Sequence, residues 1–542
     1  MCTPSKTLQS CVPFPLDDAL LQEVVEKAKD WAIMHGAAMR SKQDFNPDAL
    51  LFAPFILTPS SFPRKEFQKA VELQPLLNEL IHAVAHDSQF LLATLSSTEK
   101  VDEFTRALIA IYRTVLDEGI AQVRGRGGVN MKIITPGGQI AVAALYSSTK
   151  RSTLIGSLCS RKKDKAVIKP LSLGLLRSDL MLETRCDNDC GERARAINAY
   201  CCWKQVEINT IASGFGHLGP SSKYLQSYIL SELGHREKLV NLPDNKALSG
   251  LCDAMVEAWK LQARPSAAIL FVVENVTYNI CDQRFHEFYI RETYPHVAVV
   301  RRTLTQIGEQ GRLGPGKELL VGDVEASVVY FRAGYEPGHY FGAGEWDARL
   351  LIERSVAIKC PSIQYHLAGT KKVQQALAKP DVLRRFVGDD APKIEAIRDI
   401  FTGLYSLDRE EGGDEAVALA LADPERYVLK PQREGGGNNV YGADIPAALQ
   451  AMSSAERSAW ILMERIFPPL STGYMVRPNG PVPPPLVQLV SELGIFGAII
   501  GSKDKVLYNK QIGHMLRTKL SSSNEGGVAA GSGALDSPYL ID

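Results

Sequence analysis

The segment LKPQREGGGNNVYG, residues 429–442, places charged side chains directly before a run of glycines. Backbone N–H groups of glycine can approach an anion closely, so Gly435, Gly436 and Gly437 are candidates for a phosphate-binding loop. The run matches neither the P-loop nor the dinucleotide-fold pattern, and a flexible hairpin turn explains three glycines equally well. Glu434 favours the phosphate loop, because a carboxylate beside phosphate oxygens is repulsive unless a cation such as Mg²⁺ lies between them.

A second set of candidate Mg²⁺ ligands lies in the sequence EINT, which begins at Glu207. Side chains two apart in a strand point to the same face, so Glu207 and Asn209 are predicted to lie together. A carboxylate and an amide oxygen on one face suit a hard cation. Taken alone, the pair is equally well explained as a solvated strand face.

Cations that could neutralise phosphate occur at several positions. Arg517 and Lys519 share a strand face by the same alternation, which suits an anionic substrate and a nucleotide phosphate. Lys371 begins a helix after a Gly-Thr turn, and Lys430 ends a strand just before the glycine run. A single lysine is usually solvated, so the argument depends on the set. Met463, in the apolar strand AWILMERI, could lie against a purine, although such a methionine is more often plain core.

Length and composition limit the classes of protein that need to be considered. A chain of 542 residues exceeds one usual domain, and 61 basic and 61 acidic residues give a formal net charge of zero. This balance does not favour a nucleic-acid or membrane-surface partner. The N-terminal sequence lacks a secretory signal, no apolar run reaches the ~18 residues of a membrane span, and ten cysteines are scattered as reduced thiols would be. The sequence therefore predicts a cytoplasmic protein.

The elements that must position these residues follow from hydrophobic periodicity. Residues 16–122 are predicted to be helical, and residues 123–169 form a basic block with ten Lys or Arg, one Asp and a net charge of +9. Beyond it, strands and helices alternate as in α/β folds. Strands are predicted at 204–213, 267–274, 296–303, 326–335, 426–431, 459–466, 486–501 and 506–520, and helices at 278–295, 347–359 and 370–387. A hairpin turn is predicted at 501–505 and a small-residue loop without regular structure at 521–539.

Ten motifs, taken in order, resemble those of the eukaryotic glutathione synthetase family of the ATP-grasp superfamily. They are LSSTEKVDEFTRAL, RSDLM, QVEINTIAS, VVYFRAGY, LAGTKKVQQ, VLKPQREGGGNNVYG, ILMERI, SELGIFG, LRTK and GGVAAG. The resemblance covers nearly the whole chain outside residues 123–169. It implies an α/β (α+β) class, with an ATP-grasp fold that has an N-terminal helical layer and an inserted α/β substrate-binding domain. The implied divisions are 1–267, 268–370 for the inserted domain, and 371–542 with the lid loops.

The resemblance also implies an activity: Mg²⁺-dependent ligation of γ-glutamylcysteine to glycine by a homodimer, with ATP converted to ADP and phosphate through an acyl phosphate. Such a reaction needs no protein nucleophile, because positioning and charge neutralisation supply the catalysis. Two alternatives stay open. One is a homoglutathione-type ligase that uses β-alanine, and the other is a catalytically weak regulator that binds nucleotide or thiol peptide.

The family's site residues carry over onto matching positions of this sequence. The metal ligands would be Glu207, Asn209 and Glu434, and the catalytic cations Lys371, Lys430 and Arg517. The ATP-binding set would be Glu207, Lys371, Lys430, Glu434, Gly435, Gly436, Gly437, Asn438, Asn439, Tyr441, Met463, Glu464, Arg465, Ile466, Glu492, Lys519 and Glu525. The substrate-binding set would be Arg177, Ser213, Asn279, Gln283, Arg332, Tyr335, Arg517, Val528 and Ala529.

Three features depart from the family pattern. The family's T-I-S-A-S is TIASG here, which moves the serine to Ser213. The family's charged E-R-N is replaced by Thr277-Tyr278-Asn279, which loses an acidic contact for the substrate ammonium. The block 123–169 has no recognised counterpart and precedes the loop expected to carry Arg177. It is predicted to be a dispensable excursion or a gene-model artefact, and the long segment 183–202 a surface excursion.

Overall fold

The computed structural model describes residues 7–119, 170–185, 202–433, 437–528 and 532–542. The basic block at 123–169 lies outside the described residues, as do most of the segment 183–202, the stretch from Glu434 to Gly436, and Ala529. Helices and strands are mixed along the described chain, which confirms the predicted α/β (α+β) class.

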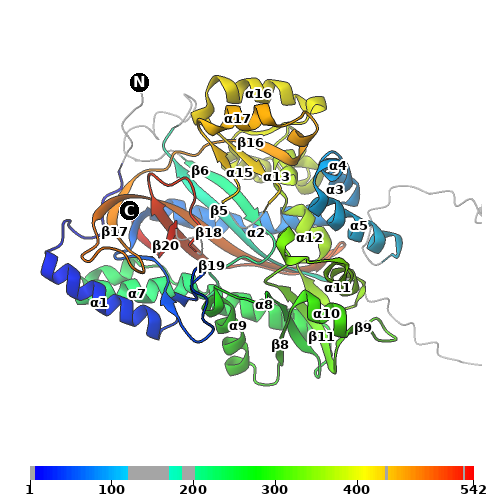
Figure 1. Ribbon diagram of the computed structural model, residues 1–542, viewed down its shortest axis with the longest axis horizontal. Helices are drawn as coiled ribbons and strands as arrows, with labels where there is room; N and C mark the ends of the chain where they lie inside the picture. The colour runs from blue at the N-terminus through cyan, green and yellow to red at the C-terminus, as the bar shows by residue number, and fades with distance from the viewer. Residues whose placement is uncertain (1–6, 120–169, 186–201, 434–436, 529–531) are drawn as a thin grey trace, which may run out of the picture.

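One 13-stranded sheet organises the fold (Figure 1). Its main path of neighbouring strands is β17 (Ser471–Val476), β3 (Phe55–Ile56), β20 (Gly533–Asp536), β19 (Lys505–Leu520), β18 (Leu486–Ser502), β5 (Ser172–Glu183), β12 (Ile358–Cys360), β11 (Val324–Phe331), β10 (Leu319–Val321) and β9 (Gly311–Leu313). Off this path, β6 (Cys202–Asn209) pairs with β5, and β7 (Ala268–Val272) pairs with β11 and with β8 (Val299–Arg302). The pairings of β8, β7, β11 and β12 are parallel, so these strands end at one edge of the sheet.

The centre of the sheet brings together segments that are far apart in the sequence. The strands β18 and β19 form a long hairpin around the predicted turn at 501–505, and β5 lies between β18 and β6. The register places Glu492 opposite Arg517 on the hairpin. On the other side of β5, Asp179 lies opposite Glu207, and Arg177 lies opposite Asn209. Directly paired residues point to the same face of a sheet, so charged side chains from four strands converge.

Helices cover both faces of the large sheet because its side chains alternate between them. On β5, Leu176 and Leu180 pack in one core with α2 (Arg64–Ala85) and α5 (Glu103–Asp117), whereas Leu173 and Leu175 pack in another with α8 (Ala247–Leu261). Two further helices, α1 (Asp18–Met34) and α7 (Leu218–Glu232), lie beside each other near β17 and β20 (Figure 1).

A second sheet forms a separate lobe, at the top of Figure 1, with its own core. Its strand order is β13 (Leu404–Ser406), β16 (Trp460–Glu464), β14 (Tyr427–Pro431) and β15 (Val440–Tyr441), and α16 (Gly413–Ala422) and α17 (Asp444–Ala451) pack against it. The buried Lys372 of α13 (Lys371–Leu377) ties the lobe to the rest of the molecule, because its Nζ donates to Ser406 Oγ (2.7 Å) and to Glu411 Oε2 (3.1 Å).

The two ends of the chain are joined by sheet pairing. The short strand β3 pairs with β20, and β4 (Ser60–Pro63) pairs in parallel with β21 (Pro538–Ile541). The buried Asp536 fastens this region, because it accepts hydrogen bonds from Ser60 Oγ (2.6 Å), Thr518 Oγ1 (2.6 Å) and Gln226 Nε2 (2.9 Å). Burial raises the pKa of Asp536 to about 6, against the lowering effect of these bonds.

Several sequence predictions are confirmed and others are wrong. The hairpin, the strand carrying Glu207, and the helices α1, α2 and α5 lie where the periodicity predicted them. The loop predicted at 521–539 is wrong beyond residue 532, because β20 and β21 pair with distant strands. Arg177 lies on the strand β5 and not on a loop. Residues 358 and 359, predicted as the end of a helix, belong to the strand β12. The prediction that 16–122 is helical missed the short strands between 38 and 63. The helices α7 and α8 are not predicted by the sequence patterns.

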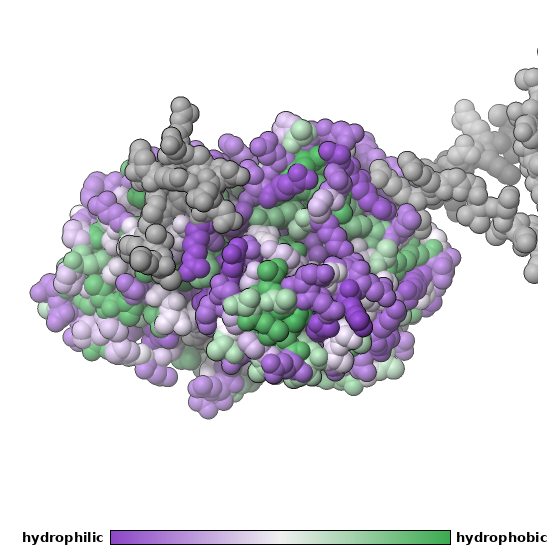
Figure 2. Space-filling model, turned by 90° about the horizontal axis from the view of Figure 1, so that it is seen from above, coloured by the Kyte–Doolittle hydropathy of each residue, from purple (hydrophilic) through white to green (hydrophobic). Residues whose placement is uncertain are grey.

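The predicted inserted domain, 268–370, contributes β7 to β12 to the large sheet through the parallel pairing of β12 with β5. Its boundaries remain a prediction. The face seen in Figure 2 is mostly hydrophilic, with smaller hydrophobic areas between. Within the described ranges, no helix is both long and apolar enough to cross a membrane.

Candidate active site

A buried carboxylate that the sequence analysis did not single out holds the centre of the site together. Asp179 on β5 accepts hydrogen bonds from Arg177 Nε (2.6 Å) and Nη2 (2.7 Å) and from Asn209 Nδ2 (3.0 Å). Burial raises the pKa of Asp179, although Arg177 opposes the shift. A Cβ on Gly494 of β18 would lie 2.9 Å from both Arg177 Cδ and Asp179 Oδ1, so the glycine leaves room for this pair. The available signal was the strand period in RSDLM, which places Arg177 and Asp179 on one face.

Glu207 is the anion at which the predicted cations meet. Its Oε2 lies 3.7 Å from Lys371 Nζ, and Lys430 Nζ donates to the carbonyl of the preceding residue, Val206 (2.9 Å). Burial disfavours the charged carboxylate, but Lys371, Lys430 and Arg517 outweigh it and lower the pKa of Glu207 to about 2. The structure therefore brings together four of the predicted residues from β6, α13, β14 and β19. An anionic ligand placed here would meet three cations at once.

The residues present fit a hard divalent cation. The Asn209 amide donates through its nitrogen to Asp179, which leaves its carbonyl oxygen as a possible ligand, and Glu207 contributes an ionised carboxylate. Oxygen donors of these two kinds suit Mg²⁺. Glu434, the third predicted ligand, lies outside the described residues.

Arg517 on β19 faces two carboxylates and keeps one donor without a partner. Its Nη2 pairs with Glu492 and lies 3.7 Å from Asp179 Oδ2, while its buried Nε has no hydrogen-bond partner among the described residues. Burial alone would lower the pKa of Arg517, but Glu492, Asp179 and Glu207 reverse the effect and raise it. An unsatisfied buried donor is costly, so the arrangement favours a bound acceptor such as a carboxylate or phosphate oxygen.

The predicted nucleotide-binding residues of the small lobe lie next to the C-terminal loop. Glu525 accepts hydrogen bonds from Gly437 N (3.2 Å), Asn439 Nδ2 (3.1 Å) and Tyr441 OH (3.1 Å). Burial, followed by Glu525, raises the pKa of Tyr441. The loop after β19 and the segment after the glycine run therefore touch through one carboxylate.

Other members of the predicted nucleotide set have clear positions. The Nζ of Lys519 donates to the carbonyl of Asn524 (2.6 Å), and Arg465 Nη2 donates to the side chain of Asn524 (3.0 Å). Burial lowers the pKa of Lys519, although Glu492 and Glu525 oppose this. Met463 is buried beside Lys430, with 3.6 Å between Sδ and Nζ. Glu464 accepts from Arg426 and from Tyr405, and Asn438 and Ile466 follow the glycine run and β16 respectively.

We expect the Glu525→Ala variant to raise the KM for ATP roughly tenfold, because it removes charge-assisted hydrogen bonds that join the two loops, and such bonds contribute about 1.5–3 kcal/mol. KM for ATP should be measured with the other substrates saturating. Glu415→Ala, at an exposed position on α16, is the matched control and should leave KM unchanged. An unaltered KM in Glu525→Ala would show that this contact plays no part in nucleotide binding.

The predicted peptide-binding residues lie beyond the ends of β7 and β11. The buried Arg332 pairs with Asp282 (3.2 Å) and donates to the carbonyl of Ser213 (3.1 Å). The amide of Gln283 donates to Asn279 Oδ1 (2.9 Å). The Oγ of Ser213 is buried and has no partner within the described residues.

Val528, Ala529 and Arg177 are the remaining residues that were predicted to bind substrate. Val528 is buried in a hydrophobic cluster that also contains Leu218 and Leu535. Ala529 lies outside the described residues. Arg177 has its guanidinium committed to Asp179 and to the carbonyl of Gly214 (3.0 Å).

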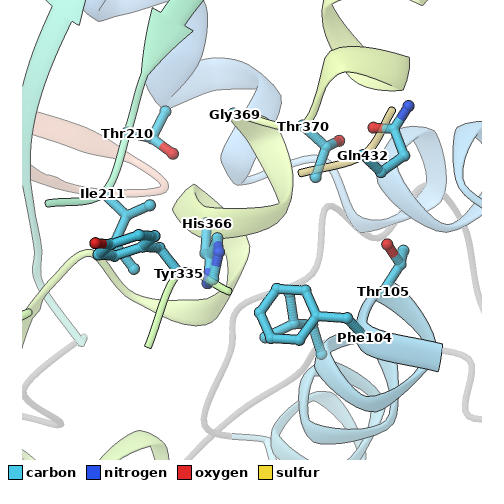
Figure 3. A pocket seen from close by; sticks show the side chains of 10 residues that line it. Phe104, Thr105, Thr210, Ile211, Tyr335, His366, Gly369, Thr370 and Gln432 are labelled. Atoms are coloured by element: carbon cyan, nitrogen blue, oxygen red, sulfur yellow. The ribbon is translucent and has the colours of Figure 1, made fainter. Parts of the chain in front are cut away.

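A recess lies between the helical layer and the loops of the site (Figure 3). Phe104 and Thr105 of α5 line one side, and Tyr335 lines another together with Ile211. The remaining lining residues are Leu108, Thr210, His366, Gly369, Thr370 and Gln432. The recess borders the segments that carry the charged centre. Its lining includes Thr210, Thr370 and Gln432, which are close in sequence to Asn209, Lys371 and Lys430 respectively.

Three cations gathered around a carboxylate, next to a separate small lobe, are suited to an enzyme that binds ATP. The chain belongs to the eukaryotic glutathione synthase family: the profile described as "Eukaryotic glutathione synthase, ATP binding domain" matches residues 18–127 and 151–540. The unmatched residues 128–150 fall inside the block 123–169. The resemblance seen in the motifs is thereby confirmed.

The chain is similar to named relatives over nearly its whole length. Glutathione synthetase of Xenopus laevis and that of Homo sapiens are each 38% identical over 527 residues, covering 97% of this chain and 98% of the relative. The chloroplastic glutathione synthetase of Solanum lycopersicum is 36% identical over 541 residues, covering 98% of this chain and 86% of the relative.

A solved structure of a glutathione synthetase-like effector from Globodera pallida shares the fold, with a TM-score of 0.70 and 24% identity, covering 98% of this chain and 100% of that chain. This likeness confirms the fold class.

Proposed function

We propose that this chain is a glutathione synthetase, a ligase that joins γ-glutamylcysteine to glycine while ATP is converted to ADP and phosphate. Family membership supports the reaction class. The observation that carries the proposal is the meeting of Lys371, Lys430 and Arg517 at Glu207, because phosphoryl transfer needs cations around the transferring group.

The chemistry follows from the charges in the site. A peptide carboxylate is a poor electrophile, so its oxygen attacks the γ-phosphorus of ATP, ADP leaves, and an acyl phosphate forms. The amine of glycine then attacks the acyl carbon, the peptide bond forms and phosphate departs. Lys371, Lys430 and Arg517 hold the anionic oxygens in line and offset their charge. The protein supplies no nucleophile in this scheme.

The proposal includes Mg²⁺, held by Glu207 and Asn209 together with Glu434. When bound, Mg²⁺ offsets the charge on the ATP phosphates. We also propose, from the family resemblance, that the enzyme is a homodimer and acts in the cytoplasm. Glycine is proposed as the acceptor because Val528-Ala529-Ala530-Gly531 keeps the family's small-residue loop.

The test is phosphate release by the purified protein with each component omitted in turn. The proposal expects release only when ATP, Mg²⁺, γ-glutamylcysteine and glycine are all present, and glutathione as the product by mass. Nucleotide binding without peptide product would favour the regulator instead. A kcat/KM for β-alanine equal to or above that for glycine would favour the homoglutathione-type ligase, because one extra methylene is discriminated by only about 10- to 200-fold.

A further inference from the structure

Beyond the ends of β7 and β11, Glu274, Glu336 and His339 form a cluster that the proposed mechanism does not use. One ligand atom from each residue lies within 4.8 Å of the others. Glu274 follows β7, and the other two follow β11. Ligands of open α/β sheets bind beyond the carboxyl ends of parallel strands, so the cluster lies where a substrate would be expected.

Hydrogen bonding argues against a metal site here. The backbone N–H of Gly334 donates to His339 Nδ1 (3.2 Å), so Nδ1 acts as an acceptor and the ring is neutral. Its proton is then on Nε2, which donates to Glu274 Oε1 (2.7 Å) and has no lone pair left for a cation. The pair of Glu274 and neutral His339 therefore keeps a full negative charge.

The cluster and the buried Arg332 have a common neighbour, Tyr335. The rings of Tyr335 and His339 pack edge to face, with centroids 4.6 Å apart. Burial raises the pKa of Tyr335, Glu274 and Glu336 raise it further, and Arg332 opposes them, so the phenol lies within reach of charges of both signs. The Nε of Arg332 is buried and has no partner among the described residues, which independently indicates a missing ligand.

Two other acidic side chains in this part of the site already have several partners within the protein. Asp282 accepts from three backbone N–H groups and from Arg332. Glu287 pairs with two arginines. Glu274 differs, since its side chain is 26% exposed and, among the described residues, only its Oε1 accepts a hydrogen bond, from His339. Thr277, in the segment that follows Glu274, is buried and carries no charge.

We propose that Glu274 binds the α-ammonium group of the γ-glutamyl donor, with His339 fixing the carboxylate. The inference rests on the proposed function, because it names the residue that binds the α-amino end of that donor. An α-amino acid end carries an anion and a cation a few ångströms apart, and it needs charges of opposite sign at a similar spacing. Arg332 and Glu274, which both act on the Tyr335 phenol, supply the two charges.

The experiment compares γ-glutamylcysteine with glutarylcysteine, which lacks only the α-amino group. Binding of each donor is measured by calorimetry in the presence of Mg²⁺ and a non-hydrolysable ATP analogue, and kcat/KM is measured by phosphate release. The wild type should prefer γ-glutamylcysteine by roughly 10- to 100-fold. In Glu274→Gln the preference should fall to near unity through weaker binding of γ-glutamylcysteine, with glutarylcysteine and KM for ATP unchanged. Glu274→Asp, which keeps the charge, should retain part of the preference.

Two controls separate this inference from its alternatives. Glu292→Gln, an exposed carboxylate on α9 (Ile280–Thr293), should keep the wild-type ratio. Wild-type discrimination in Glu274→Gln, or its loss in Glu336→Gln instead, would overturn the assignment. If the wild type binds the donors with the expected preference but forms no peptide, the proposed function fails while Glu274 keeps its role. If it binds neither donor, both fail.

Discussion

The Glu207→Gln variant is expected to lose about 10²- to 10³-fold in kcat/KM for Mg²⁺-ATP, equivalent to roughly 3–4 kcal/mol of transition-state stabilisation. The change removes the ionised carboxylate that is proposed to bind Mg²⁺ and leaves an amide among Lys371, Lys430 and Arg517. The rate should be measured over a range of Mg²⁺ concentrations, and half-maximal activity should need more Mg²⁺. Near-normal turnover would remove Glu207 from the metal site.

The pH dependence of stability gives a second check on the same variant. The pKa of Glu207 in the folded protein, about 2, lies below its ordinary value of about 4.5. A lowered carboxylate pKa stabilises the fold above the unfolded-state value, and this stabilisation is lost as the pH falls towards 2. Glu207→Gln should therefore lower the free energy of unfolding most at pH 5 to 8, with a smaller difference at pH 3. The exposed Glu309→Gln on α10 (Leu304–Gln310) is the matched control.

Arg517→Lys is expected to reduce kcat about 10²-fold while the KM for ATP changes little. Lysine keeps the positive charge but lacks the planar fork that pairs with Glu492 and the Nε–H that has no partner in the described part of the chain. If that N–H binds an oxygen whose charge develops during phosphoryl transfer, the loss falls on the chemical step. Single-turnover acyl phosphate formation, read as ADP release without glycine, measures this step.

Arg398→Lys, at an exposed position on α15 (Ala391–Ile400), controls for the substitution itself. An Arg517→Lys variant with normal kcat and a raised KM for ATP would contradict the assignment and make Arg517 a ground-state binding residue. Thermal unfolding of both variants should accompany the kinetics, because a buried cation between two carboxylates also stabilises the fold.

The charged residues of the site could be predicted from the sequence because strand alternation is local. Glu207 with Asn209 follows from a period of two, and the position of Lys371 at a helix start follows from its Gly-Thr turn. Strand alternation does not show which strands are neighbours in the sheet. Asp179 belongs to the centre only because β5 lies between β18 and β6, and the pairing with β18 joins segments that are hundreds of residues apart in the sequence.

The same limit explains the wrong predictions. Gly533-Ala534-Leu535-Asp536 has the composition of a loop, yet it forms β20 because β19 and β3 satisfy its backbone groups. Residues 358 and 359 continue an apparent helical pattern but lie between β5 and β11, where tertiary pairing overrides propensity. His339 and Glu274 lie 65 residues apart, so no local pattern could have paired them.

The pairing of β3 and β4 with β20 and β21 sets a condition on how the chain can fold as it is made. Ser60 bonds to Asp536, 476 residues further along, so β3 and β4 wait for these partners while the intervening residues are made. At 5–20 residues per second this wait lasts roughly 25–95 s. During it, the edge of β3 and the apolar face beneath it are open to chaperones or to wrong partners. A chain cut short just before Gly533 would keep most of the candidate site residues but lack β20 and β21, so β3 and β4 would lose these partners and the product would be suited to rapid degradation.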